Sequence, residues 1–310
     1  MRKVRRTAIL WATAVVLWIG AAAGAAAEDL KPFLLGSYTK GDFTNTISEV
    51  RNVLQSEGFQ IAGEYSPYEN AHVIVVTDDF LRRLAGQEEG GAYMAGERVS
   101  IVRDGDKVQV AYANPVYLAN AYRVDADVTP VADRLKRALG YEKGFGAKGL
   151  SPSKLRRYHY AFGMEYFDEP LTLAKYDDQR EAIRAIEKAL DARAGGVAPV
   201  YRIDSTNGAV TVFGVAMSEG YSADAKVMSI IDVDELKSAA HLPYEMVVRD
   251  GTVQALAPRF RIAISFPDQK MFGENSFMQI MSSPKEIQDA LTQAAGKEVK
   301  ETTSRGGFNF

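Results

Sequence analysis

The chain has no cysteine and only three histidines among its 310 residues. The absence of cysteine excludes disulfides, a thiolate nucleophile, a zinc–thiolate site, covalently attached c-type haem and an acylated lipoprotein anchor. Stability must therefore come from a hydrophobic core. With 46% apolar residues, a chain of this length can bury one large core or two ordinary ones.

The sequence motifs of common hydrolases are also missing. There is no G-x-S-x-G, no H-E-x-x-H, and no S-x-x-K accompanied by K-T-G. Residues 151–154 spell S-P-S-K, but Ser151 is expected only to cap a helix that starts at the next residue. Paired carboxylates at Asp78-Asp79 or at Asp232 and Asp234 leave an enzyme open as an alternative. The expectation is a protein without catalytic activity.

Gly144, Gly146 and Gly149 have the spacing of a dinucleotide-binding fingerprint. That fingerprint requires a preceding buried strand and a following helix that receives the pyrophosphate. Here the glycines follow the expected end of a helix at Gly140. We therefore predict a flexible linker at this point and no cofactor.

Residues 1–27 have the order of a secretory signal peptide. Four basic residues precede an apolar run at 8–20, and an alanine-rich stretch leads to a cleavage site after Ala27. The alternative, an uncleaved anchor, needs a run of about 20 residues. We expect a periplasmic protein that meets the membrane only through this peptide. Its removal lowers the formal net charge by four, from −3 to −7, which disfavours nucleic-acid binding.

Two halves of the chain contain the same order of expected elements. Val-Arg-Asp-Gly occurs at 102–105 and at 248–251, and a Val-Gln pair follows each shortly afterwards. Around these landmarks the periodicity predicts an α+β fold with two repeated β-α-β-β-(short α)-β-β-α units, mainly antiparallel sheets backed by helices. The sequence leaves open whether the two sheets join edge to edge or stack face to face.

The predicted bounds follow from this pattern. The first unit spans 28–142, a linker 143–157, the second unit 158–300 and a flexible tail 301–310. The expected opening strands are 33–38 and 158–166, the expected first helices 43–59 and 176–195, and the expected short helices 78–84 and 232–240. The last helix of each unit is expected to have a hydroxyl N-cap, at Thr129 and at Ser283, and to end at a glycine.

The second unit resembles a bacterial family known as domain of unknown function 302. The resemblance rests on Phe213-Gly214-Val215-Ala216, Leu242-Pro243-Tyr244 and the hairpin at 246–253, while the first unit matches through its element order and Gly58-Phe59. It implies two copies of a β-α-β4-α core of the TATA-binding-protein-like class, and no established chemistry. The family has Leu-Pro-Cys where this chain has Leu-Pro-Tyr, so any role of that cysteine is absent here.

The histidines are the candidates for a metal or haem site. His72 lies in the first unit, whereas His159 and His241 lie in the second, so a common site would require the interface between units. The alternative is that they are structural or surface residues. His159 and Met164 would face opposite sides of the expected strand and would not act as a pair.

Aromatic residues supply the candidates for a ligand site. Tyr158 and Tyr160 alternate with further large residues along an expected strand, whose face either packs as core or lines a cavity. Tyr117 and Asn120 follow the first unit's second hairpin and are candidates for a pocket rim. The sequence thus predicts an exported binding or accessory protein, with an apolar or aromatic small ligand or a protein partner. The ligand-binding candidates are Tyr117, Asn120, Tyr158, Tyr160 and Tyr244; a histidine-bound metal or haem is the alternative.

Overall fold

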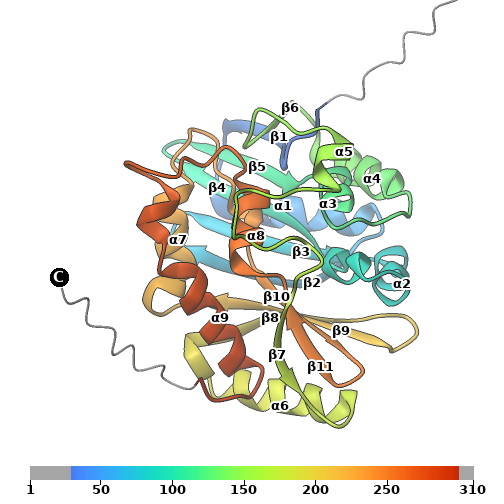
Figure 1. Ribbon diagram of the computed structural model, residues 1–310. Helices are drawn as coiled ribbons and strands as arrows, with labels where there is room; N and C mark the ends of the chain where they lie inside the picture. The colour runs from blue at the N-terminus through green and yellow to red at the C-terminus, as the bar shows by residue number, and fades with distance from the viewer. Residues whose placement is uncertain (1–28, 300–310) are drawn as a thin grey trace, which may run out of the picture.

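The computed structural model describes residues 29–299. The expected signal peptide and the tail at 301–310 lie outside the described residues. The described chain is α+β, with two antiparallel sheets backed by helices, which confirms the predicted class (Figure 1). Among these residues, no helix is long and apolar enough to cross a membrane.

The first sheet has six strands in the order β2-β3-β4-β5-β1-β6, and all neighbours are antiparallel. We call residues 29–157 the first unit, because the last strand and the short helix after it pack on the same body. The strands are β1 (Phe33–Lys40), β2 (Gln60–Tyr68), β3 (Ala71–Thr77), β4 (Glu97–Asp104), β5 (Lys107–Ala113) and β6 (Lys143–Phe145).

The second sheet has five strands in the order β7-β11-β10-β9-β8, again antiparallel throughout. Residues 158–299 are the second unit. Position by position, this order matches β1-β5-β4-β3-β2 of the first sheet. The strands are β7 (Leu171–Lys175), β8 (Val197–Asp204), β9 (Val210–Met217), β10 (Tyr244–Arg249) and β11 (Thr252–Ala255).

Each sheet has one outer face that is covered by two helices of its own unit. Helix α1 (Phe43–Ser56) and helix α4 (Thr129–Leu139) pack on the first sheet. Helix α6 (Gln179–Asp191) and helix α9 (Ser283–Ala294) pack on the second. The first helix of each pair begins at an aspartate whose carboxylate accepts a backbone N–H, at 2.8 Å in both cases.

The inner faces of the two sheets stack on each other. In β3, Ile74 and Val76 face the outer helices, while Val73 and Val75 lie in a cluster that includes Val212 of the second sheet. The sheets are separate in hydrogen bonding, and they approach closely where Gly63 of β2 meets β8. Of the two arrangements that the sequence left open, the structure adopts the stacked one.

Each unit contributes a short segment that covers the inner face of the other unit's sheet. In the first unit, the connection from β3 to β4 contains helix α2 (Asp79–Gln87) and the 3₁₀ turn η1 (Gly90–Met94), and η1 packs on β9 and β10. In the second, the connection from β9 to β10 contains helix α7 (Asp224–Ile231) and the turn η4 (Ala239–His241). This turn packs on β3, β4 and β5. The two units are therefore covered reciprocally.

Two further helices fill the space between the sheets. Helix α3 (Pro115–Ala121) follows β5, and helix α8 (Pro258–Ser265) follows β11, each with proline in its first turn. Helix α8 is buried along nearly its whole length. Neither helix was part of the repeat predicted from the sequence.

The repeated Val-Arg-Asp-Gly tetrapeptide is not structurally equivalent in the two units. The first hairpin closes on the Asp104–Lys107 pair and the second on the Arg249–Thr252 pair, so the tetrapeptides are one residue out of register. A shift of one residue places matched side chains on opposite faces of a strand. The Val-Gln pairs that follow are in register. The duplication itself stays a prediction.

Several predicted boundaries were wrong. Residues 158–166 form no strand, because Gly163 adopts φ +79° within a turn, and the second unit's first strand starts only at Leu171. The short helix expected at 232–240 lies earlier, as α7, and 232–238 is a loop. The expected linker at 143–157 is ordered, since it contributes β6 and helix α5 (Pro152–Leu155).

The predicted hydroxyl caps were also wrong. Thr129 and Ser283 are already the first helical residues of α4 and α9, and neither helix has a side-chain hydrogen bond at its N-cap. The carboxylate of Asp127 accepts the Thr129 N–H instead, at 2.9 Å. Ser151 is at the N-cap of α5, as expected, but its hydroxyl makes no capping bond.

Candidate functional site

A cleft of about 280 Å³ opens between the two units. One wall comes from the first unit, at the turn between β2 and β3 and the end of β4, and the other comes from α7 and the loop after it. We call this the inter-unit cleft. Its lining residues are Tyr68, Asn70, Val102, Arg103, Ala225, Met228, Ser229, Asp232 and Lys237.

Lys237 belongs to the second unit but is fixed on the first sheet. Its backbone N–H donates to the side-chain oxygen of Gln109 at 2.9 Å, and its carbonyl accepts the Gln109 amide at 2.7 Å. Gln109 is buried on the inner face of β5. The Lys237 ammonium also donates to the carbonyl oxygens of Asp232 and Asp234, the second at 2.6 Å. This lysine is therefore held in place at the junction of the units.

Arg103 lines the cleft from the first unit. Its Nε and Nη2 both donate to the side-chain oxygen of Asn70, at 3.1 and 2.6 Å, and its backbone N–H donates to the Asn70 carbonyl. Its guanidinium also lies over the ring of Phe43. These contacts fix the side chain and leave Nη1 without a protein partner among residues 29–299.

Two titratable groups in the cleft keep their protons more readily than usual. Burial raises the pKa of the Asp232 carboxyl to about 7, opposed by the Ser238 N–H and by Lys237. Both carboxylate oxygens of Asp232 accept that N–H, at 2.9 Å. Burial and the nearby Asp232 also raise the pKa of Tyr68. The phenol thus remains a hydrogen-bond donor at neutral pH.

A second polar assembly lies deep between the sheets, and we call it the central polar cluster. Glu245 of β10 forms an ion pair with Arg98 of β4 and a second one, at 3.5 Å, with Arg261 of α8. Arg261 in turn donates to Ser265 and to the carbonyl of His241. The cluster consists of Arg98, His241, Tyr244, Glu245, Arg261 and Ser265.

The central polar cluster contains a serine beside a histidine, yet it is not arranged for catalysis. His241 Nδ1 lies 2.9 Å from Ser265 Oγ, and its Nε2 lies 3.2 Å from the Tyr244 hydroxyl. Burial, with Arg261 and Arg98 nearby, lowers the pKa of His241, so the imidazole is neutral. Ser265 is only 3% exposed and His241 1%, which leaves no path for a substrate. The cluster joins the two units.

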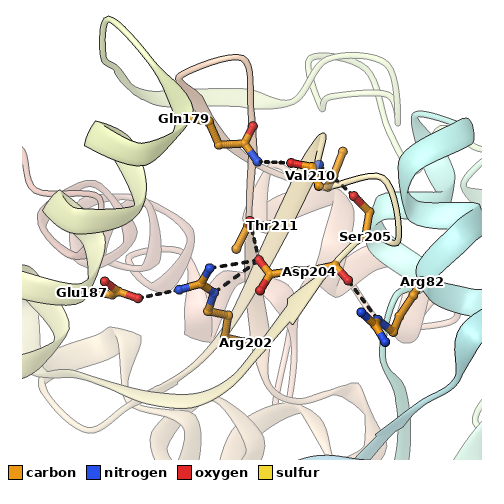
Figure 2. A network of polar contacts seen from close by, with 9 residues as sticks. Arg82, Gln179, Glu187, Arg202, Asp204, Ser205, Val210 and Thr211 are labelled. Atoms are coloured by element: carbon orange, nitrogen blue, oxygen red, sulfur yellow. Dashed lines mark hydrogen bonds and ion pairs between the residues drawn. The ribbon is translucent and has the colours of Figure 1, made fainter.

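A further polar network, between α2 and β8, also links the units (Figure 2). Arg82 of α2 donates from Nε to the backbone carbonyl of Asp204 at 3.0 Å. The Asp204 carboxylate accepts the Thr211 hydroxyl and the Arg202 guanidinium, which also contacts Glu187 of α6. The first unit's α2 is thus tied to the second unit's edge strand.

Three of the predicted ligand-binding residues donate to backbone carbonyls at or just after the end of α8. The Tyr158 and Tyr117 hydroxyls donate to the carbonyls of Ala263 and Ile264, at 2.9 and 2.8 Å, and Tyr160 donates to Gln269 at 2.6 Å. Tyr244 belongs to the central polar cluster. These hydroxyls donate to backbone carbonyls, and those of Ala263 and Ile264 lie in the last turn of α8, where carbonyls lack a partner within the helix. Asn120 donates within its own helix, to the carbonyl of Val116.

The three histidines do not converge. His72 contacts Ser66 and Glu64, His159 stacks on Tyr166 at a ring distance of 4.1 Å, and His241 is buried in the central polar cluster. Over residues 29–299, no group of three or more histidines and carboxylates is placed to hold a metal ion.

In each of the predicted carboxylate pairs, one member is buried and the other is exposed. Asp78 caps α2 through the Leu81 N–H and forms an ion pair with Arg134, while Asp79 lies in solvent. Asp232 faces the cleft and Asp234 is exposed. Sequence reasoning missed Arg103, Gln109 and Lys237. The only available signal was a repeated Val-Gln pair whose glutamine lies on an inner strand face.

Comparisons with known proteins give little more. No protein-family model matches the chain, and no curated protein matches it. Among solved structures, a similar chain is described as the crystal structure of an uncharacterized conserved protein, DUF302, from Bacillus stearothermophilus. It is 13% identical, with a TM-score of 0.31, and the match covers 34% of this chain and 94% of that one. A likeness at this level carries no argument about activity.

Proposed function

We propose that this chain is an exported, periplasmic binding or accessory protein, built from a duplicated unit, whose ligand occupies the inter-unit cleft. The observation that carries the proposal is the lining of the cleft: apolar side chains at Tyr68, Val102 and Met228 lie beside a few fixed polar groups. This combination is typical of small-molecule sites. The proposed role is binding without catalysis.

Native mass spectrometry of the chain purified from periplasm tests the proposal. We expect the wild-type protein to retain a small molecule that the Ala225→Trp variant loses. Ala225 is exposed on α7 and lines the cleft, so an indole there fills the cleft without disturbing the core. Wild type and variant that are equally free of ligand, or that carry the same adduct, would contradict the proposal. Export is checked separately by the intact mass, which should be that of a chain cleaved after Ala27.

A further inference from the structure

We infer that the ligand of the inter-unit cleft carries a carboxylate or a comparable single negative charge on a small apolar or aromatic body. This inference rests on the proposed function and adds the chemistry of the ligand. Its basis is that Arg103 and Lys237 reach the same cleft from different units, and neither forms an ion pair with any carboxylate of residues 29–299.

The free hydrogen-bonding capacity of the cleft consists mainly of donors. Arg103 has its Nη1 free, Lys237 uses two of the three protons of its ammonium, and the Tyr68 hydroxyl stays protonated. Among the acceptors, the Asn70 oxygen receives two bonds from Arg103, and both oxygens of the Asp232 carboxylate receive the Ser238 N–H. Two cations beside the single carboxylate of Asp232 leave the cleft with a surplus of positive charge, which favours an anion over a neutral or cationic ligand.

The remaining wall defines the rest of the ligand. Val102 and Met228 are buried side chains at the base of the cleft, and Tyr68 adds an aromatic ring. A volume of about 280 Å³ accommodates one ring or a short alkyl chain. An anion placed here would contact one cation from each unit and would join the two walls.

Both cations are fixed before any ligand arrives. Arg103 is held by Asn70, and Lys237 is clamped through its backbone to Gln109. Binding therefore costs little side-chain entropy, which is the main penalty when long flexible cations are recruited.

Isothermal titration with matched probes tests the inference. The probes are benzoate, 3-phenylpropanoate and hexanoate, each paired with its uncharged amide, added to the mature chain at neutral pH. We expect at least one acid to bind at least tenfold more tightly than its amide. Arg103→Gln and Lys237→Gln should each lower the affinity for that acid at least tenfold and leave the affinity for the amide unchanged. Arg202→Gln, which removes an exposed guanidinium far from the cleft, should change neither.

The outcomes separate this inference from the proposed function. Equal affinity for an acid and its amide, with both lost in Ala225→Trp, overturns the anionic ligand and retains the cleft as a binding site. Failure of every acid and every amide to bind overturns the inference, while the native mass spectrum of the periplasmic chain still decides the proposed function. Tight acid binding that Ala225→Trp does not affect also overturns the inference, because the acid would then be bound elsewhere.

Discussion

The first and second units use the same order of five strands and the same pair of outer helices, but they differ in the segments that connect them. The first unit adds β6 and α5 after its last helix. The second adds residues 158–170 before β7 and residues 266–282 between α8 and α9. The added segments hold the most exposed large apolar residues, with Phe162 fully exposed and Phe272 73% exposed. The units thus agree in their cores and differ at their surfaces.

The comparison also shows that the units depend on each other. Each sheet has outer helices from its own unit, yet its inner face is covered by a turn from the other unit, η1 or η4. The charged groups of the central polar cluster lie at that inner contact. Changes there should destabilise both units together, whereas changes on the outside should act weakly.

The largest effect is expected from Glu245→Gln. This change leaves Arg98 and Arg261 buried without their carboxylate partner, and such a loss costs about 3–5 kcal/mol of unfolding free energy. Urea unfolding followed by circular dichroism measures it, and both units should unfold in one transition. The control is Glu187→Gln, whose partner Arg202 is well exposed, with an expected cost of at most about 1 kcal/mol. Equal effects of the two changes would show that the cluster does not hold the units together.

An intermediate effect is expected for the Asp224 carboxyl taken alone, as the pH changes. Burial raises its pKa to about 7, opposed by the Met217 N–H and by the Tyr65 hydroxyl from the first unit. The folded chain therefore keeps a proton that the unfolded chain releases near pH 4. The contribution of Asp224 to the free energy of unfolding is fully present below pH 4 and is lost as the pH rises towards 7, by up to about 4 kcal/mol for a fully buried group. Burial also raises the pKa of Asp232 and Glu97 to about 7, so they act in the same direction.

Urea unfolding at pH 5 and pH 8 measures this dependence. The Asp224→Asn variant should lose part of the difference in unfolding free energy between the two pH values. Tyr65→Phe serves as the control, because it removes the hydrogen bond between units but keeps the buried carboxyl, and it should retain the difference. The lowered pKa of His241 acts in the opposite direction between pH 5 and pH 8, so the test is the comparison of the variants with the wild type. An Asp224→Asn variant that keeps the full wild-type difference would contradict the assignment of this carboxyl.

The smallest effect is expected at the contact of the two edge strands. A Cβ at Gly63 of β2 would overlap the Val200 carbonyl of β8, so Gly63→Ala must push the strands apart, at a cost of about 1–3 kcal/mol. Gly41→Ala is the matched control, because the nearest atom to its added Cβ lies 3.6 Å away. Thermal melting distinguishes them. If the melting temperature falls no further for Gly63→Ala than for Gly41→Ala, the contact of the two edge strands tolerates separation.

The strands and outer helices could be predicted because each follows a local rule. Val50 and Leu54 recur at helical spacing, and alternation along β3 separates inner from outer residues. Residues 158–166 also alternate, but their tyrosine hydroxyls are directed to the end of α8 rather than along a sheet. Periodicity alone does not distinguish these cases, since the deciding contact is with a helix about a hundred residues away.

The inter-unit cleft could not be predicted for a related reason. Lys237 and Arg103 are ordinary charged residues in sequence, and only the bond between Gln109 and the Lys237 backbone brings them to one place. A sequence signal did exist for the central polar cluster. Glu245 lies between Tyr244 and the apolar run 246–248, at an inward position, where a charge must have a buried partner.

The reciprocal cover by η1 and η4 has a consequence for how the chain reaches its native state. The part of the first sheet's inner face that η4 covers stays exposed until residues 239–241 have been synthesised and have docked, so the first unit lacks this cover when its own residues are complete. Long-range closure of this kind slows folding and prolongs the exposure of apolar strand faces. We therefore expect the first unit to aggregate when it is produced alone. During synthesis, its apolar inner face must be shielded by the second unit or by a chaperone.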